Sequence, residues 1–155
     1  MIVRRFAPAA TAVATLLGST AVAEVTASQV WEEMKAQIDI YGEGVTIGNE
    51  DVSGGTVTIS DIVVDVSDDY DAIMVTVPQI VFAEQGDGTV AITLSDDIPF
   101  SFDSSSYDWE NDTFEPTTYE GAVRHSGLSM IVSGTPDKMT YDYSADRYAV
   151  ELDGA

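Results

Sequence analysis

Apolar residues recur at every second position in short runs along most of this chain, beginning just after Gly55. In the first run Val57 and Ile59 alternate with polar residues, and at Ser60-Asp61 the apolar positions change phase to Ile62, Val64 and Val66. A period of two is that of a strand buried on one face, and a slip of one residue suggests a β-bulge. The pattern therefore predicts a bulged sheet.

A second run makes the same slip at Pro78. Apolar residues alternate in one phase over residues 73–77 and in the other phase over residues 80–82. Because proline cannot donate to a strand ladder, its place at the switch favours a bulge or an edge position. Two such slips in successive runs predict a curved sheet.

Shorter strands are predicted further along the chain, with turns at Thr135-Pro136-Asp137 and Ala145-Asp146. The stretch from Asp103 to Pro116 is rich in Ser, Asp and Glu and predicts a long connection, after which a strand pair resumes at Thr117 to His125. The other expected strands cover residues 89–94, 98–102, 126–134, 138–144 and 147–153.

One helix precedes the strands. Thr26 and Gln29 have the spacing of a capping box, in which each side chain serves the other's free backbone N–H. An apolar stripe follows at Val30, Met34 and Ile38, and Gly42 stands where the helix should end. The predicted fold class is α+β, mainly β: an antiparallel, bulged sheet with one N-terminal amphipathic helix.

Residues 1–23 have the three parts of a secretory signal peptide: Arg4 and Arg5, an apolar stretch, and the small-x-small site Ala21-Val22-Ala23. We expect cleavage after Ala23, a periplasmic location and a single β-rich domain over residues 24–155. The apolar stretch is too short to span a bilayer, and no later segment is apolar enough, so we expect no transmembrane anchor after cleavage.

The charge of the mature chain is extreme. After Ala23 there are four basic and 27 acidic side chains, a net charge of −23. Nucleic acids are bound through Lys and Arg, so we expect no nucleic-acid partner. The composition favours solubility first, and then attraction of cations or of a basic partner.

Acidic clusters raise the question of metal binding. Gly86-Asp87-Gly88 between two apolar runs is typical of a hairpin turn, and it offers too few oxygens for calcium. Asp108, Glu110 and Asp112 match alternate ligand positions of a calcium loop, but Thr113 and Tyr119 stand where that loop needs glycine and glutamate. These three acids are the candidate ligands for weak divalent cations, and no cofactor is predicted.

Catalytic patterns are scarce. The chain has no cysteine and no Gly-x-Ser-x-Gly, and its one histidine, His125, ends a predicted strand, where we expect a surface group rather than a catalytic base. Tyr141, Tyr143 and Tyr148 are typical of cross-strand pairs, with a sugar or lipid platform as the alternative. No catalytic or cofactor-binding residue is assigned, and the interpretation leans away from an enzyme.

Four segments resemble a known family, occurring in the order "VTASQVWEEMKA", "YGEGVTIGNE", "FAEQGDGTVAITLSDDIPF" and "HSGLSMIVSGTPDKMTYDYSA". Together they resemble domain-of-unknown-function family 2125 (DUF2125) of alphaproteobacteria, over essentially the whole chain. The resemblance implies an exported, β-rich protein of uncharacterised function, and it supplies no catalytic residues. Members are typically longer, so this chain resembles the N-terminal portion, which implies an unpaired sheet edge near its end.

Two functions from different classes follow. The first is a non-catalytic binding or scaffold module of the cell envelope that presents an apolar sheet face to a lipid or an envelope protein. The second is a carboxylate-dependent hydrolase or a calcium-binding protein. A continuous apolar face would favour the first, and a cleft holding paired carboxylates would favour the second.

Overall fold

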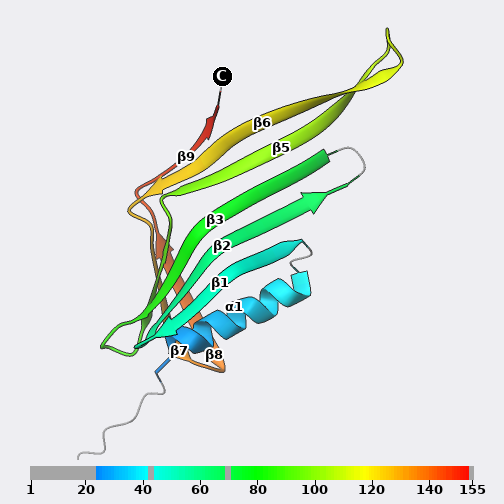
Figure 1. Ribbon diagram of the computed structural model, residues 1–155. Coiled ribbons are helices and arrows are strands. Elements are labelled where there is room, and N and C mark those ends of the chain that lie inside the picture. The colour runs from blue at the N-terminus through cyan, green and yellow to red at the C-terminus, as the bar shows by residue number, and fades with distance from the viewer. Residues whose placement is uncertain (1–23, 42–43, 69–70, 154–155) are drawn as a thin grey trace, which may run out of the picture.

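The structure is a computed structural model that describes residues 24–41, 44–68 and 71–153. It consists of one helix and one antiparallel sheet of nine strands (Figure 1), which confirms the predicted α+β, mainly β fold class. The elements are α1 (Ala27–Tyr41), β1 (Val45–Ser53), β2 (Thr56–Ser67), β3 (Asp71–Glu84), β4 (Val90–Leu94), β5 (Asp97–Asp108), β6 (Thr113–Ser126), β7 (Ser129–Thr135), β8 (Lys138–Ser144) and β9 (Arg147–Leu152).

The helix begins as the capping box predicts. The Thr26 N–H donates to Gln29 Oε1 at 3.0 Å, and the Gln29 N–H donates to Thr26 Oγ1 at 3.2 Å. The Ala27 N–H donates to Glu84 Oε1 at 3.1 Å, so the first turn is also tied to the end of β3. The predicted stop at Gly42 lies outside the described residues.

The nine strands follow six paths across the sheet. β4 and β5 both run antiparallel to β3, along its second and first halves. β7 and β6 pair with them in turn, and β8 and β9 pair with β7 and β6. Each of these three couples is therefore one strand path with a break, and the sheet is an up-and-down meander.

The breaks align across the sheet. Gly48, Asp61 and Pro78 occupy one register position in β1, β2 and β3. Hydrogen bonds continue the line, from the Ser95 N–H to the Gln79 carbonyl at 3.0 Å, from the His125 N–H to the Asp96 carbonyl at 3.1 Å, and from the Asp146 N–H to the Ser126 carbonyl at 3.0 Å. We call this line the crease; β7 and β8 run at a steep angle to β6 and β9 on its other side (Figure 1).

The phase slips predicted at Asp61 and Pro78 lie on the crease, but neither inserts a residue between β1, β2 and β3. The β2–β3 register is the same on both sides of Asp61, whose φ of 56° turns the strand instead. An inserted residue does occur one path further on. Four residues of β3 separate Val75 from Ile80, and five residues separate their partners Phe100 and Leu94.

The long connection predicted from Asp103 to Pro116 is wrong, because β5 and β6 pair along this stretch up to a short turn at residues 109–112. Polar residues hold the ladder there: Thr118 Oγ1 donates to Asp103 Oδ1 at 2.6 Å across the strands. Nearer the turn the rings of Tyr107 and Phe114, which are opposite each other, have centroids 5.1 Å apart. Such cross-strand pairs stabilise a strand whose composition resembles a loop.

The hydrophobic core lies between α1 and one end of the sheet. Trp31 and Phe82 are fully buried there, with ring centroids 5.7 Å apart. Burial of side chains of this size contributes roughly 1.5–3 kcal/mol each. The buried hydrophobic residues of the described chain are Val25, Ala27, Val30, Trp31, Val57, Ile59, Ile62, Phe82, Val90, Ile92 and Val132.

Candidate functional site

The core covers only part of the sheet. Its buried residues come from α1, its lead-in, β2, β3, β4 and β7, and among the described residues none comes from β5, β6, β8 or β9. On β3 the residues that pack against the core end at Val77. Beyond the crease, β5, β6 and β9 therefore extend past the helix, as Figure 1 shows.

The apolar pattern nevertheless continues onto this half. Ile62 is buried under α1. Every second residue after it on β2, and the residues opposite these on β3 and β5, lie on the same face of the sheet. Phe100 and Phe102 lie opposite Val75 and Ile73, and β6 and β9 extend the row. We call this surface the open face; its residues are Val66, Ile73, Val75, Ile98, Phe100, Phe102, Tyr119, Gly121, Val123, Tyr148, Val150 and Leu152.

Exposure confirms that α1 does not reach the open face. Ile73 is 45% exposed, Val66 57% and Val150 67%. Soluble proteins expose single apolar side chains freely, but a contiguous apolar surface rimmed by polar residues marks an interaction site. The open face spans five neighbouring strands, so it is contiguous by register.

Aromatic rings fill the middle of the open face. The rings of Phe102 and Tyr119 are stacked across β5 and β6, with centroids 6.1 Å apart. Gly121 lies opposite Phe100, and a Cβ there would stand 3.0 Å from Phe100 Cζ. The missing side chain leaves room for the Phe100 ring and for the Glu151 carbonyl oxygen of β9.

The opposite face of the same strands, which we call the outer face, is charged. Arg124 Nε donates to Asp97 Oδ1 at 3.3 Å, and its Nη1 pairs with Glu151, so the arginine links β5, β6 and β9. These two carboxylates raise the pKa of the Arg124 guanidinium. All three groups are exposed, so solvent screens the pairs and they contribute little to stability.

The late tyrosines do not pair with one another. Tyr141 lies opposite Val132, Tyr143 opposite Met130, and Tyr148 opposite His125. Each tyrosine therefore has a cross-strand neighbour by register, and the rings of Tyr148 and His125 have centroids 6.4 Å apart. Since β8 and β9 form an edge of the sheet, all three rings stay at least 40% exposed, and Tyr148 adds to the rim of the open face.

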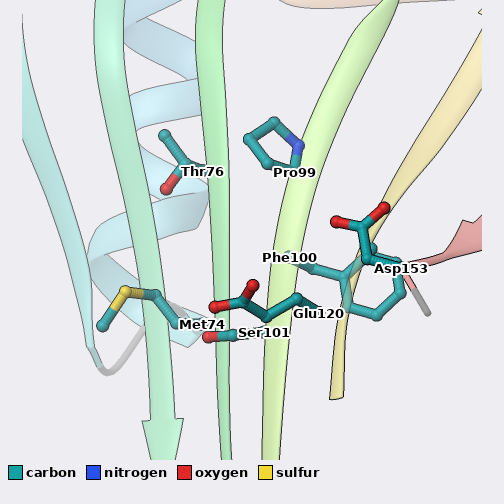
Figure 2. A pocket seen from close by; sticks show the side chains of 8 residues that line it. Met74, Thr76, Pro99, Phe100, Ser101, Glu120 and Asp153 are labelled. Carbon is teal, nitrogen blue, oxygen red and sulfur yellow. The ribbon is translucent and has the colours of Figure 1, made fainter. Parts of the chain in front are cut away.

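A shallow depression of about 260 Å³ on the outer face holds the carboxylates of Glu120 and Asp153. Figure 2 shows both carboxylates on the same side of the sheet as Met74 and Thr76. It holds two carboxylates, as the hydrolase hypothesis requires, but no histidine or basic side chain lines it. Its lining consists of the outer-face residues Met74, Thr76, Pro99, Ser101, Glu120 and Asp153, together with Phe100 and Gly121 from the strands' open-face positions.

The three candidate metal ligands lie together in and beside the β5–β6 turn. Asn111 Nδ2 donates to Asp108 Oδ2 at 2.6 Å and the Glu110 N–H donates to Asp108 Oδ1 at 2.8 Å, and these bonds lower the pKa of Asp108. Asp112 accepts the Tyr107 hydroxyl. Within the described residues no group of three or more acidic, histidine or cysteine side chains is arranged to hold a metal ion. The weak cation site therefore stays a prediction.

The Gly86-Asp87-Gly88 stretch lies in a turn, as predicted. Asp87 Oδ1 accepts both the Thr89 hydroxyl at 2.7 Å and the Thr89 N–H at 3.1 Å. The Gln85 N–H donates to the Thr89 carbonyl at 2.8 Å and closes the loop between β3 and β4. Gly88 has a φ of 83°, which a side chain would disfavour.

His125 is not the surface group that its strand-end position suggested. It is 9% exposed and lies at the crease, with Nε2 2.9 Å from the Ser95 carbonyl oxygen. Its Nδ1 is 3.8 Å from Asp96 Oδ1. Its neighbours are the residues between β4 and β5 on one side and Tyr148 of β9 on the other. The ring is held by a backbone carbonyl, and no serine hydroxyl contacts it in the described structure, which is not the arrangement of a catalytic triad.

The described part of the chain contains no helix long and apolar enough to cross a membrane. Comparison with known proteins finds no matching family model, no similar curated protein and no similar solved structure. The resemblance to DUF2125 thus stays a prediction.

Proposed function

We propose that this protein is a non-catalytic binding module of the periplasm that holds an apolar partner, a lipid or an envelope protein, against the open face. The signal-like residues 1–23 support the location. One observation carries the binding role: the alternation that builds the core continues past α1 onto β5, β6 and β9, and no buried residue of the described hydrophobic core lies on these three strands.

The physical reason is the layer that is missing. A sheet with one apolar face must bury that face against a second layer. Here the second layer is α1, and the strands that it contacts most are β2 and β3. A partner that covers the rest would remove apolar area from water, worth about 25 cal/mol per Å² before the cost of association.

The test uses two adjacent residues of β3. Ile73 and Met74 are both 45% exposed, but Ile73 belongs to the open face and Met74 to the outer face. Ile73→Lys and Met74→Lys change the net charge equally. The neutral apolar dye Nile red, titrated into the exported protein, reports binding through its fluorescence.

We expect Ile73→Lys to weaken dye binding roughly tenfold, since one buried aliphatic side chain is worth about 1.5 kcal/mol or more. Met74→Lys should change it less than about twofold, the effect typical of a surface substitution. Absence of dye binding, or an equal loss in both variants, would remove the open face as a binding site.

A further inference from the structure

The charge around the open face has one sign. Of the four basic side chains among the described residues, none belongs to it. Lys35 lies on the side of α1 that faces β1, where Nζ is 2.8 Å from Glu32 and 3.4 Å from Glu50. The other three alternate onto the outer face of their strands: Arg124, Lys138 and Arg147.

Carboxylates stand at the borders of the same face. Asp71 shares the alternation phase of Ile73 at the start of β3, and Glu115 shares that of Tyr119 near the start of β6. An apolar surface bordered only by negative charge favours a partner that combines an apolar stripe with cations.

The width of the open face suits one helix. Strands lie about 4.8 Å apart, so β3, β5, β6 and β9 together span roughly 14 Å between the outer strand axes. A helix with its side chains is about 10–12 Å across. α1 already shows how a helix is seated on this sheet, with Val30 and Trp31 buried and Met34 and Ile38 packed against the core.

We propose that the open face is the docking surface for a cationic amphipathic helix of a partner protein, laid beside α1 to complete the helical layer. This inference rests on the proposed function and names its partner. The helix would place its apolar stripe over Phe100, Phe102 and Val150, and its Lys or Arg residues toward the bordering carboxylates. An anionic lipid headgroup would meet repulsion at the same borders.

The probe is a synthetic 18-residue amphipathic peptide of Leu and Lys, compared with a Leu and Glu peptide that keeps the same apolar positions. Fluorescence anisotropy of labelled peptide is measured with the exported protein at 0.15 M salt, where screening limits non-specific attraction to about 8 Å. We expect the Lys peptide to bind at least tenfold more tightly than the Glu peptide.

Matched variants locate the binding. Ile73→Lys should weaken binding of the Lys peptide at least tenfold. Met74→Lys has the same net charge and should weaken this binding less than threefold. Asp71→Asn at the border should weaken it about threefold, whereas Asp65→Asn, on the outer face of β2, should not. If Ile73→Lys does not fold by circular dichroism, Val150→Lys on edge strand β9 replaces it, since Val150 is 67% exposed.

Four results would overturn this inference. Equal losses in Ile73→Lys and Met74→Lys would show attraction by net charge alone. If both peptides bind equally, or if neither binds while Nile red still binds the open face, the proposed binding function would stand and a cationic helix as the partner would be rejected. Co-flotation of the protein with zwitterionic phosphatidylcholine vesicles, lost in Ile73→Lys but not in Met74→Lys, without binding of the Lys peptide would identify a lipid surface. Self-association in sedimentation, lost in Ile73→Lys alone, would identify a second copy as the occupant.

Discussion

Gly48 in β1 lies opposite Asp61 in β2, and a Cβ added to Gly48 would stand only 2.7 Å from the Cβ of Asp61. Asp61 has a φ of 56°, a conformation that side chains other than glycine adopt at a cost. The left-handed turn at Asp61 moves its side chain over the neighbouring strand, and the missing side chain of Gly48 leaves room for it. These two residues together form the crease on this side of the sheet.

This contact predicts that mutations of Gly48 and Asp61 have coupled effects on stability. We expect Gly48→Ala to destabilise the fold by about 1–3 kcal/mol, the usual cost of overpacking. Asp61→Gly removes the obstructing Cβ, so the double variant should recover most of that loss, and the coupling should exceed about 0.5 kcal/mol. Urea unfolding followed by circular dichroism measures the cycle. Additive effects within error would mean that the two residues do not share a constraint.

The phase slips at Asp61 and Pro78 could be predicted because a strand period that changes face is visible in one sequence. Their alignment with Gly48, Ser95-Asp96, Ser126-Gly127 and Ala145-Asp146 could not be predicted in the same way. It depends on register between strands, and the last three breaks resemble ordinary turns when each is considered alone.

The same limit explains the error at Asp103 to Pro116. Serine and aspartate are depleted in strands, so composition favoured a loop. The stretch forms a strand because Thr118 bonds to Asp103 and Tyr107 packs on Phe114 across the pair, contacts that only the register reveals. The open face was expected in outline, as an apolar sheet face. Its residues depend on the register that places β9 beside β6, which the sequence pattern does not reveal.

Trp31 predicts where stability resides. It is 1% exposed and packs on Phe82, whereas Trp109 is 86% exposed at the β5–β6 turn. Trp31→Ala should cost about 3–5 kcal/mol, the usual range for truncating a buried aromatic side chain. Trp109→Ala should cost less than about 1 kcal/mol, since it loses mainly an edge contact with Tyr107. Similar midpoints of urea unfolding in the two variants would show that the core under α1 does not dominate.

The capping box allows a smaller, sharper test. Thr26→Ala removes the acceptor of the Gln29 N–H, and we expect a loss of about 1 kcal/mol. Thr26→Ser keeps the oxygen and should stay within a few tenths of a kcal/mol of the wild type. Hydrogen exchange at the Gln29 amide shows whether the lost hydrogen bond causes the lower stability. Protection of this amide should fall in Thr26→Ala and persist in Thr26→Ser. Unchanged protection in both variants would mean that the Thr26 hydroxyl does not stabilise the start of the helix.

The turn at Asp87 predicts a pH dependence with a definite sign. The Thr89 hydroxyl and then the Thr89 N–H, both donating to Asp87 Oδ1, hold the pKa of this carboxyl below its ordinary value of 3.8. Since the folded pKa is depressed, the carboxylate contributes stability that is fully present above the unfolded pKa and is lost as the pH falls through the folded pKa. Thr89→Val removes the hydroxyl at nearly the same volume, so the pKa of Asp87 should rise toward 3.8 while the backbone bond remains. A carboxyl-carbon NMR titration measures this directly.

Asp108, whose pKa is lowered by Asn111 at a separate turn, serves as the internal control, and its pKa should not change. A rise in both pKa values would indicate a general change in charge or fold, and no rise at Asp87 would mean that the hydroxyl does not stabilise the ionised turn.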